Sequence, residues 1–226
     1  MTEPCCDARY DEQFDARAAE RELAAYRKRG PSAATRRLAA VLAADGAAGL
    51  TVLDVGAGIG GLHHLLLEAG AASAVDVDAS RPYLEAARSE AERRGLGDRV
   101  RFEFGDLTLI GGRIEPADLV ALDRVVCCHP DVAALVGAAA SRTQRRLALV
   151  LPHDRAWIRA AIAVANLVER LRRRTFRIFI HPISAVDVAA AGAGLGRTER
   201  RSLGLFWQLL AYERPAAHGA PSQPGG

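Results

Sequence analysis

The residues best placed to do chemistry in this chain form a glycine-rich stretch. Gly56, Gly58 and Gly60 alternate with other residues directly after the apolar run 51–55, and Gly61 follows them. Glycine lets the backbone approach a ligand more closely than any residue with a Cβ atom. The stretch therefore predicts a loop that holds a ligand between a strand and a helix. Gly61 is expected to serve the packing of that helix on the sheet.

The glycines alone do not decide which ligand the loop holds. Gly56, Gly58 and Gly61 have the G-x-G-x-x-G spacing of dinucleotide-binding proteins. An NAD-dependent oxidoreductase is therefore one candidate function. A regulatory protein that binds a cofactor without catalysis is another.

Carboxylates follow the glycine loop at the ends of further apolar runs. Asp76 and Asp78 lie about twenty residues after the glycines, where a carboxylate can accept both hydroxyls of a ribose. Asp106 follows the third run, and Asp123 follows the fourth. Ligands of an open parallel sheet bind outside the carboxyl ends of its strands, so we expect these side chains to border one site.

The segment after Asp123 contains the residues that could act on a second substrate. It includes Cys127, Cys128 and His129. An imidazole with a pKa near neutrality suits removal of a proton from a hydroxyl group, and His129 or His153 could provide it. A hydrogen-bonded structural role is the alternative for both histidines, and it is the preferred interpretation for His153.

The cysteines occur as two adjacent pairs, Cys5–Cys6 and Cys127–Cys128. If the two pairs and His129 came together, their soft ligands could hold a metal or metalloid. Methylation of a thiol, selenol or arsenic acceptor is then an alternative function. The chain has no C-x-x-C spacing, and buried, inert cysteines are the simpler interpretation. We therefore predict no metal site.

The elements that must position these residues alternate along the chain. Five apolar runs predict strands, at residues 51–55, 74–77, 101–104, 119–122 and 147–151. Intervening helices are predicted at residues 63–69, 81–94 and 132–144. Later helices are expected at residues 157–171 and 183–191, followed by closing strands at 200–205 and 207–212. The alternation predicts an α/β, Rossmann-like, doubly wound sheet that is mostly parallel, with an antiparallel last strand.

Composition changes divide the chain into three parts. Residues 1–46 are expected to be a helical N-terminal cap, interrupted at Gly30–Pro31, with Ser32 capping a second helix that runs to Ala44. Residues 47–214 are expected to form the cofactor-binding domain. Residues 215–226 are rich in proline, glycine and serine, and are predicted to be disordered.

These motifs together resemble the class I S-adenosylmethionine-dependent methyltransferases. Asp54 completes the form D-x-G-x-G-x-G, residues 78–87 resemble the family's D-x-S-x-x-x-L-x-x-A run, and Gly105–Asp106–Leu107 resembles its G-D segment. The resemblance implies S-adenosylmethionine as the cofactor, with Asp54 at the methionine amine, Asp78 at the ribose and Asp106 at the adenine. The cofactor-binding residues so implied are Asp54, Gly56, Ala57, Gly58, Gly60, Val77, Asp78, Asp106, Leu107 and Asp123.

The second-substrate side loosely resembles the magnesium-protoporphyrin IX O-methyltransferases. These enzymes carry an aspartate, two apolar residues, a His-Tyr pair and a proline where this chain has residues 123–130. The family's histidine falls here on Cys127 or Cys128, and His129 lies beside it. Tyr10 resembles the tyrosine of the family's N-terminal cap. The resemblance implies methylation of a small molecule on oxygen, with a tetrapyrrole-like carboxylate as one acceptor. The candidate catalytic residues are therefore His129, Tyr10, Cys127 and Cys128.

Composition limits the partners. The net charge is only +3, so no nucleic-acid partner is expected. No apolar run reaches the ~18 residues of a membrane span, and residues 1–15 lack the apolar core of a secretory signal, so a cytoplasmic location is expected. The helix expected at 157–171 has an apolar stripe bordered by arginines. Core packing, a homodimer face, and binding of a flat apolar ligand that bears carboxylates remain open for this stripe.

Overall fold

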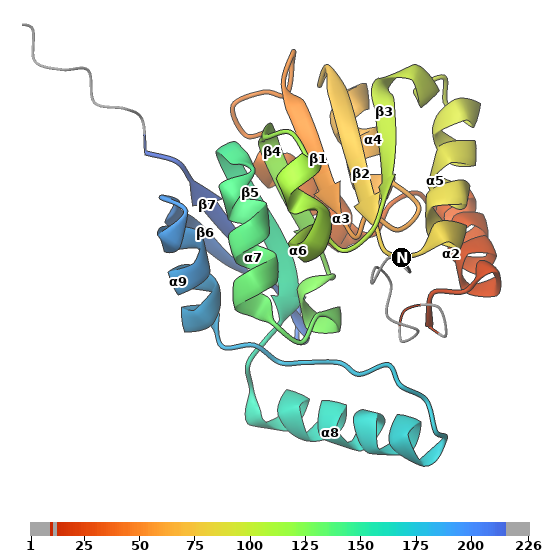
Figure 1. Ribbon diagram of the computed structural model, residues 1–226, viewed down its shortest axis with the longest axis vertical. Coiled ribbons are helices and arrows are strands. Elements are labelled where there is room, and N and C mark those ends of the chain that lie inside the picture. The colour runs from red at the N-terminus through yellow and green to blue at the C-terminus, as the bar shows by residue number, and fades with distance from the viewer. Residues whose placement is uncertain (1–9, 11–12, 216–226) are drawn as a thin grey trace, which may run out of the picture.

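The computed structural model describes residue 10 and residues 13–215. A single seven-stranded sheet has the strand order β3-β2-β1-β4-β5-β7-β6 (Figure 1). The strands are β1 (Thr51–Val55), β2 (Ser73–Asp78), β3 (Val100–Phe104), β4 (Ala117–Asp123), β5 (Thr143–Pro152), β6 (Gly196–Leu203) and β7 (Trp207–Glu213). Strands β1 to β5 run parallel, and β7 pairs antiparallel with both β5 and β6. This arrangement confirms the predicted mostly parallel, Rossmann-like sheet with antiparallel closing strands.

Helices cover both faces of the sheet. They are α2 (Ala16–Arg29), α3 (Ala33–Leu42), α4 (Gly61–Glu68), α5 (Arg81–Arg93), α6 (Leu107–Ile110), α7 (Val132–Ser141), α8 (Ala156–Leu171) and α9 (Ile183–Gly192). One core cluster packs α3, α4 and α5 on the strands, and a second packs α6, α7 and α9 on the opposite face. The central strands are apolar almost throughout because both of their faces are covered. Among the described helices none is long and apolar enough to cross a membrane.

The helix termini follow the local sequence. Asp15 caps α2 and accepts a hydrogen bond from the Ala18 amide, and Ser32 caps α3 as predicted. Gly30, with φ of 72°, ends α2 and lets the chain turn into α3. Leu38 and Leu42 of α3 belong to the same core as the central strands. The two N-terminal helices are therefore packed onto the body that carries the glycine loop.

Several predicted boundaries were wrong, among them the start of β5, which was expected at residue 147 and lies at Thr143. The helix expected over 132–144 ends at Ser141, because Thr143 already pairs with Ala117 of β4 and begins β5. The second N-terminal helix ends at Leu42 rather than Ala44. The closing strand expected at 200–205 is β6, which begins at Gly196 and ends at Leu203, before the turn at Gly204 with φ of 94°.

Candidate active site

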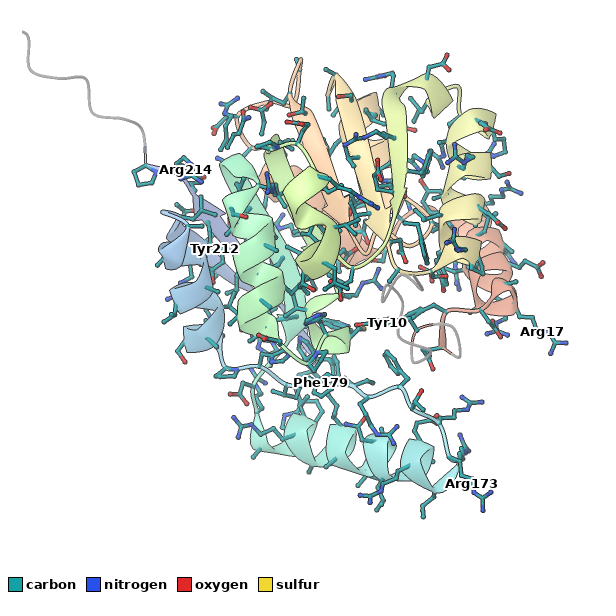
Figure 2. The ribbon with its side chains drawn as sticks, viewed as in Figure 1. Tyr10, Arg17, Arg173, Phe179, Tyr212 and Arg214 are labelled. Carbon is teal, nitrogen blue, oxygen red and sulfur yellow. The ribbon has the colours of Figure 1, made fainter. Side chains whose placement is uncertain are left out.

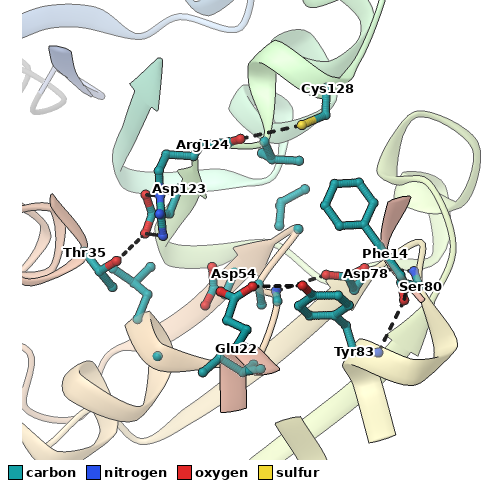
Figure 3. A pocket seen from close by; sticks show the side chains of 18 of the residues that line it. Phe14, Glu22, Thr35, Asp54, Asp78, Ser80, Tyr83, Asp123, Arg124 and Cys128 are labelled. Carbon is teal, nitrogen blue, oxygen red and sulfur yellow. Dashed lines mark hydrogen bonds and ion pairs between the residues drawn. The ribbon is translucent and has the colours of Figure 1, made fainter. Parts of the chain in front are cut away.

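A cavity of about 640 Å³ opens at the carboxyl ends of the parallel strands (Figure 3). Its wall is built from the loops that follow β1, β2, β3 and β4, and from the N-terminal helices α2 and α3. Nine of the ten predicted cofactor-binding residues line it: Asp54, Gly56, Ala57, Gly58, Val77, Asp78, Asp106, Leu107 and Asp123. The tenth, Gly60, is not part of the lining. The volume of the cavity is ordinary for a small-molecule site.

The glycine loop has the backbone that its sequence predicts. Gly56, Gly58 and Gly60 have φ of 63°, 59° and 83°, a region that residues with side chains rarely adopt. A Cβ atom on Gly56 would lie 2.4 Å from Cγ2 of Val125, so the loop also meets the segment after β4. Gly60 caps α4, and a Cβ atom there would lie 2.6 Å from the His63 ring.

Asp54 presents one oxygen of its carboxylate to a buried histidine. Its Oδ2 accepts from the His63 amide at 3.3 Å and lies 3.1 Å from His63 Nδ1, and both side chains are almost wholly buried. Among the described residues, its Oδ1 has no hydrogen-bond partner. Asp54 lines the cavity, so this oxygen can serve a ligand. Sequence reasoning did not find His63, because its role depends on the turn that carries α4 back over β1.

Asp78 is held by the backbone of two loops. Its Oδ2 accepts from the Gly58 amide at 3.0 Å, and its Oδ1 accepts from the Ser80 amide at 2.8 Å. Each oxygen keeps a second lone pair, which suits a pair of neighbouring hydroxyl groups. Burial raises the pKa of Asp78 to about 6.

Asp76 lies on β2 beside Asp54 of β1, yet it has a different environment. It is fully buried, and in the described part of the structure neither carboxyl oxygen has a partner. Burial raises its pKa well above the usual range, which favours the neutral acid over the carboxylate. Asp76 is absent from the cavity lining, which agrees with the choice of Asp78 over Asp76 as the ribose ligand.

Asp106 and His129 are paired at the cavity wall. Oδ1 of Asp106 caps α6 by accepting from the Thr108 amide at 2.8 Å, and Oδ2 lies 3.2 Å from Nε2 of His129. The other ring nitrogen of His129 lies 2.8 Å from the carbonyl oxygen of Asp131. The hydrogen bond with Asp106 raises the pKa of His129. Both nitrogens of this candidate catalytic base are therefore engaged within the protein.

The two cysteines after β4 differ in their access to the cavity. Cys128 lines it, whereas Cys127 is buried outside the lining. The Cys127 thiol and burial raise the pKa of the Cys128 thiol, so it is protonated at neutral pH. Tyr10 also lines the cavity, and its hydroxyl donates to the Cys128 carbonyl at 3.4 Å. Tyr10 and Cys128 are thus brought together, as candidate residues of the second-substrate side.

The remaining residues singled out in the sequence are Cys5, Cys6 and His153. Cys5 and Cys6 fall outside the residues that the structure describes. Within the described residues no group of three or more histidine, cysteine or acidic side chains could hold a metal ion. His153 is buried away from the cavity, with Nε2 3.1 Å from the Ser202 hydroxyl, as the structural interpretation predicts.

Asp123 connects β4 to the N-terminal helices. Its Oδ2 accepts from the Thr35 hydroxyl of α3 at 2.6 Å, and its Oδ1 lies 3.0 Å from Nε of Arg124. Arg124 has φ of 61°, a strained conformation for a residue with a side chain. Strain of this kind collects at functional sites. Thr35 and Arg124 were both missed by sequence reasoning.

Aromatic side chains close the cavity on the side of the N-terminal segment. The Phe14 ring packs edge-on against Tyr83 at 5.9 Å and against Phe176 at 5.5 Å between centroids. The Tyr83 hydroxyl donates to Oε2 of Glu22 at 2.8 Å, and the Ser80 hydroxyl donates to the Phe14 carbonyl at 2.7 Å. The Phe14 ring therefore joins α5 to the segment after α8 at the edge of the cavity.

The sequence and the fold both have known counterparts. Residues 52–146 match the family model described as a methyltransferase domain. No curated protein is detectably similar to the chain in sequence.

Solved structures share the fold. A magnesium protoporphyrin IX methyltransferase from Synechocystis PCC 6803, solved with S-adenosylhomocysteine, is 22% identical with a TM-score of 0.66, over 80% of this chain and 81% of that chain. An O-methyltransferase family protein from Burkholderia thailandensis is 21% identical with a TM-score of 0.69, over 92% and 64%. An O-methyltransferase family 2 protein from Planctomyces limnophilus, solved with apigenin, is 22% identical with a TM-score of 0.65, over 88% and 61%.

The glycine loop and the carboxylates at β1 and β2 lie within the matched residues 52–146, and the seven strands of this chain have the order 3-2-1-4-5-7-6. In this order β7 is inserted antiparallel between β5 and β6, unlike the dinucleotide-binding order 3-2-1-4-5-6. Residues 52–146 of the chain therefore match a methyltransferase domain, and the fold is that of solved methyltransferases.

Proposed function

We propose that this chain transfers a methyl group from S-adenosylmethionine to a carboxylate oxygen of a small-molecule acceptor. The cavity residues fit the cofactor. Asp54 offers a buried carboxyl oxygen that has no partner among the described residues, and Asp78 offers free lone pairs beside the glycine loop. Asp54 would take the amine of the methionine part, Asp78 the ribose, and Asp106 with Leu107 the adenine.

Methyl transfer to a carboxylate requires that the acceptor be correctly placed, and it requires no general base. S-adenosylmethionine supplies a methyl carbon that is already electrophilic, so a carboxylate can attack it without losing a proton first. The candidate proton acceptors of the cavity are occupied or protonated: His129 is paired with Asp106, and the Cys128 thiol has a raised pKa. A carboxylate acceptor matches these surroundings better than a hydroxyl group. Tyr10 and Cys128 would then line the acceptor's place rather than remove its proton.

Three arginines carry the proposal of an acidic acceptor. Arg29 at the end of α2, Arg36 of α3 and Arg124 after β4 all line the cavity. Arg36 also donates to the Pro31 carbonyl, and Arg124 pairs with Asp123. Guanidinium groups recognise carboxylates through paired hydrogen bonds. Two of the similar structures are named for O-methyl transfer and a third for magnesium protoporphyrin IX, which supports oxygen as the nucleophile and a tetrapyrrole-like carboxylate as one acceptor.

The test follows labelled methyl groups into products. The protein is incubated with methyl-labelled S-adenosylmethionine and either magnesium protoporphyrin IX or an extract of the source cells. We expect a methyl ester, whose label is released by mild alkali as methanol. Label that stays on a thioether, an aryl ether or a selenium or arsenic compound would contradict the proposal. Calorimetry with S-adenosylhomocysteine tests cofactor binding separately.

A paired variant tests the arginines. Replacing Arg29 and Arg36 with glutamine should raise the KM for the acceptor by about tenfold or more, since each charge-assisted contact contributes roughly 1.5 to 3 kcal/mol. The affinity for S-adenosylhomocysteine should change little. Arg37→Gln is the matched control, because Arg37 is exposed on α3 and does not line the cavity. Equal KM values in all three proteins would remove the arginines from acceptor recognition.

A further inference from the structure

Helix α8 stands at one edge of the molecule, away from the sheet (Figures 1 and 2). Only Ile158 and Ile162 of its sixteen residues are buried. Asn166, on the same side, exchanges hydrogen bonds with Ile178 of the segment that returns toward α9, at 2.8 and 3.0 Å. The helix is therefore attached to the protein by one narrow side.

Apart from Arg159 and Arg170, the exposed side chains of α8 are apolar. At about 100° per residue, the exposed apolar side chains that follow one another around the helix are Ala163, Ala156, Leu167, Ala160, Leu171, Val164, Trp157, Val168, Ala161 and Ala165. They cover an arc of about 200° that contains no charged residue. Leu171 is 76% exposed, Val164 62%, Leu167 54% and Trp157 50%. A continuous exposed apolar surface of this kind marks an interaction site.

Arginines surround this apolar face. Between residues 154 and 177 the chain has seven arginines against two acids, Asp154 and Glu169, which leaves five positive charges in excess. Asp154 pairs with Arg159, and Glu169 pairs with Arg172 and Arg174. The arginines lie before the apolar face, on its border and directly after it. The surface is thus apolar at its centre and cationic at its rim.

We propose that the exposed face of α8 binds the surface of an anionic phospholipid bilayer, with the helix lying in the plane of the interface. Amphipathic helices that bind in this way combine a broad apolar face bearing tryptophan and leucine with basic residues that meet the lipid headgroups. A second protein helix covers a narrower seam, which is usually flanked by charges of both signs. The wide, uncharged arc of α8 and its excess of arginine match the bilayer.

The same contact would bring the cavity close to the lipid. The return segment after α8 carries Phe176, whose ring packs on Phe14 at the aromatic edge of the cavity. Phe179 of this segment donates its amide to the Cys127 carbonyl at 2.8 Å. A bilayer under α8 would therefore lie next to the segments that cover the cavity. An amphiphilic acceptor could then reach the site from the membrane.

Flotation of the full chain with vesicles tests the proposal. The probes are vesicles of phosphatidylcholine alone and of equimolar phosphatidylcholine and phosphatidylglycerol. We expect flotation with the anionic vesicles and much less with the neutral ones. Replacing Leu167 and Leu171 with glutamate should lower binding by on the order of 100-fold, because it removes two apolar side chains from the interface and adds two repelled charges. Arg172, Arg173 and Arg174, replaced together with glutamine, should lower anionic binding by a similar factor.

The matched control places glutamate on other exposed apolar residues. Val188 of α9 is 72% exposed and Leu205 in the turn after β6 is 76% exposed, and their double glutamate variant should float like the unaltered protein. The absence of flotation with anionic vesicles would overturn the proposal. It would also be overturned if light scattering showed a dimer that the α8 variant dissociates while neither protein binds vesicles. Affinity for S-adenosylhomocysteine should be equal in all variants, so a failure here is distinct from a failure of the proposed methyl transfer.

Discussion

At the scale of single residues, two aspartates of β2 show how surroundings set chemistry. Asp76 and Asp78 are two positions apart and both belong to buried stretches. Asp78 accepts two backbone amides and faces the cavity, whereas Asp76 has no partner among the described residues. Backbone donors favour the ionised carboxylate, and burial without donors favours the neutral acid. The surroundings of Asp78 therefore suit an anion that binds a ligand, whereas those of Asp76 favour the protonated acid.

Cofactor affinity should fall in acid because Asp78 titrates. Burial raises its pKa to about 6, and only the ionised form accepts both hydroxyls of a ribose. Below pH 6 a proton must leave on binding, so the Kd for S-adenosylhomocysteine should rise by about tenfold per pH unit. Calorimetry from pH 5 to pH 8 measures this. Asp78→Asn should bind weakly with a flat profile, and the exposed Asp45→Asn should retain the slope. A flat profile for the unaltered protein would contradict the assignment.

Asp76 should make the fold less stable as the pH rises. Its folded-state pKa is raised above the unfolded value, so its contribution is fully present below about pH 4 and is lost as the pH approaches the folded-state pKa. Asp76→Asn keeps a neutral group of the same shape and removes this loss. The free energy of unfolding at pH 7 should increase, by about 1.4 kcal/mol for each pH unit above the unfolded-state pKa over which Asp76 stays protonated in the folded protein.

Urea denaturation at pH 5 and at pH 8 provides the measurement for Asp76. The stability difference between the two pH values should shrink in Asp76→Asn, and the remainder belongs to the other groups that titrate in this range, which include Asp78 and His129. If the variant showed the same difference as the unaltered protein, Asp76 would have to be ionised in the folded state.

At the scale of elements, the N-terminal segment and the segment after α8 meet at the cavity. Phe14 lies between Tyr83 of α5 and Phe176, so three elements that are distant in sequence share one ring cluster. Thr35 of α3 adds a hydrogen bond to Asp123 at the end of β4. The aromatic side chains that close the cavity therefore also form part of its wall.

The Phe14–Phe176 contact should couple these segments energetically. A double-mutant cycle with Phe14→Leu and Phe176→Leu should give an interaction of about 1 kcal/mol in the free energy of unfolding, the usual size for an edge-to-face pair. The control cycle combines Phe14→Leu with Phe206→Leu, since the Phe206 ring packs on Trp207 instead. Its interaction should be near zero. Equal interaction energies in both cycles would mean that the Phe14 and Phe176 rings contribute independently to the free energy of unfolding.

How far the sequence predicts this site depends on which contacts are local. The glycine loop, Asp54, Asp78 and Asp106 lie at or directly after strand ends, so their place could be predicted. His63, Thr35, Glu22 and Phe176 reach the site only because helices fold back over the sheet, and no local spacing marks them. The start of β6 was not predicted, because its residues are polar on both faces of the strand and give no apolar alternation.

At the scale of the whole molecule, Arg146 joins parts that the sheet alone does not connect. Its guanidinium donates to the carbonyls of Val41 and Leu42 at the end of α3, both at 3.1 Å. It also donates to Asp45 and to Glu213 of β7, each at 2.8 Å. One side chain of β5 therefore ties the N-terminal helices to the last strand.

Loss of Arg146 should weaken the fold without changing the site. Arg146→Met should lower the free energy of unfolding by about 1 to 3 kcal/mol, because two carbonyls and two carboxylates lose their donor. The affinity for S-adenosylhomocysteine should stay the same. Arg145→Met, at the exposed neighbouring position, should change stability by less than about 0.5 kcal/mol. Urea denaturation and calorimetry compare the three proteins, and equal stabilities would show that the network contributes nothing.

The position of β7 has a consequence for the folding of this protein during translation. Strand β7 comes last in sequence order but pairs with β5, and 54 residues separate Pro152 from Trp207. Until those residues have been translated, the nascent chain exposes the apolar edge of β5, a surface prone to pairing with other chains. Translation that stalls between these two strands should therefore leave a product that needs chaperones, even though every cavity-lining residue has already been made.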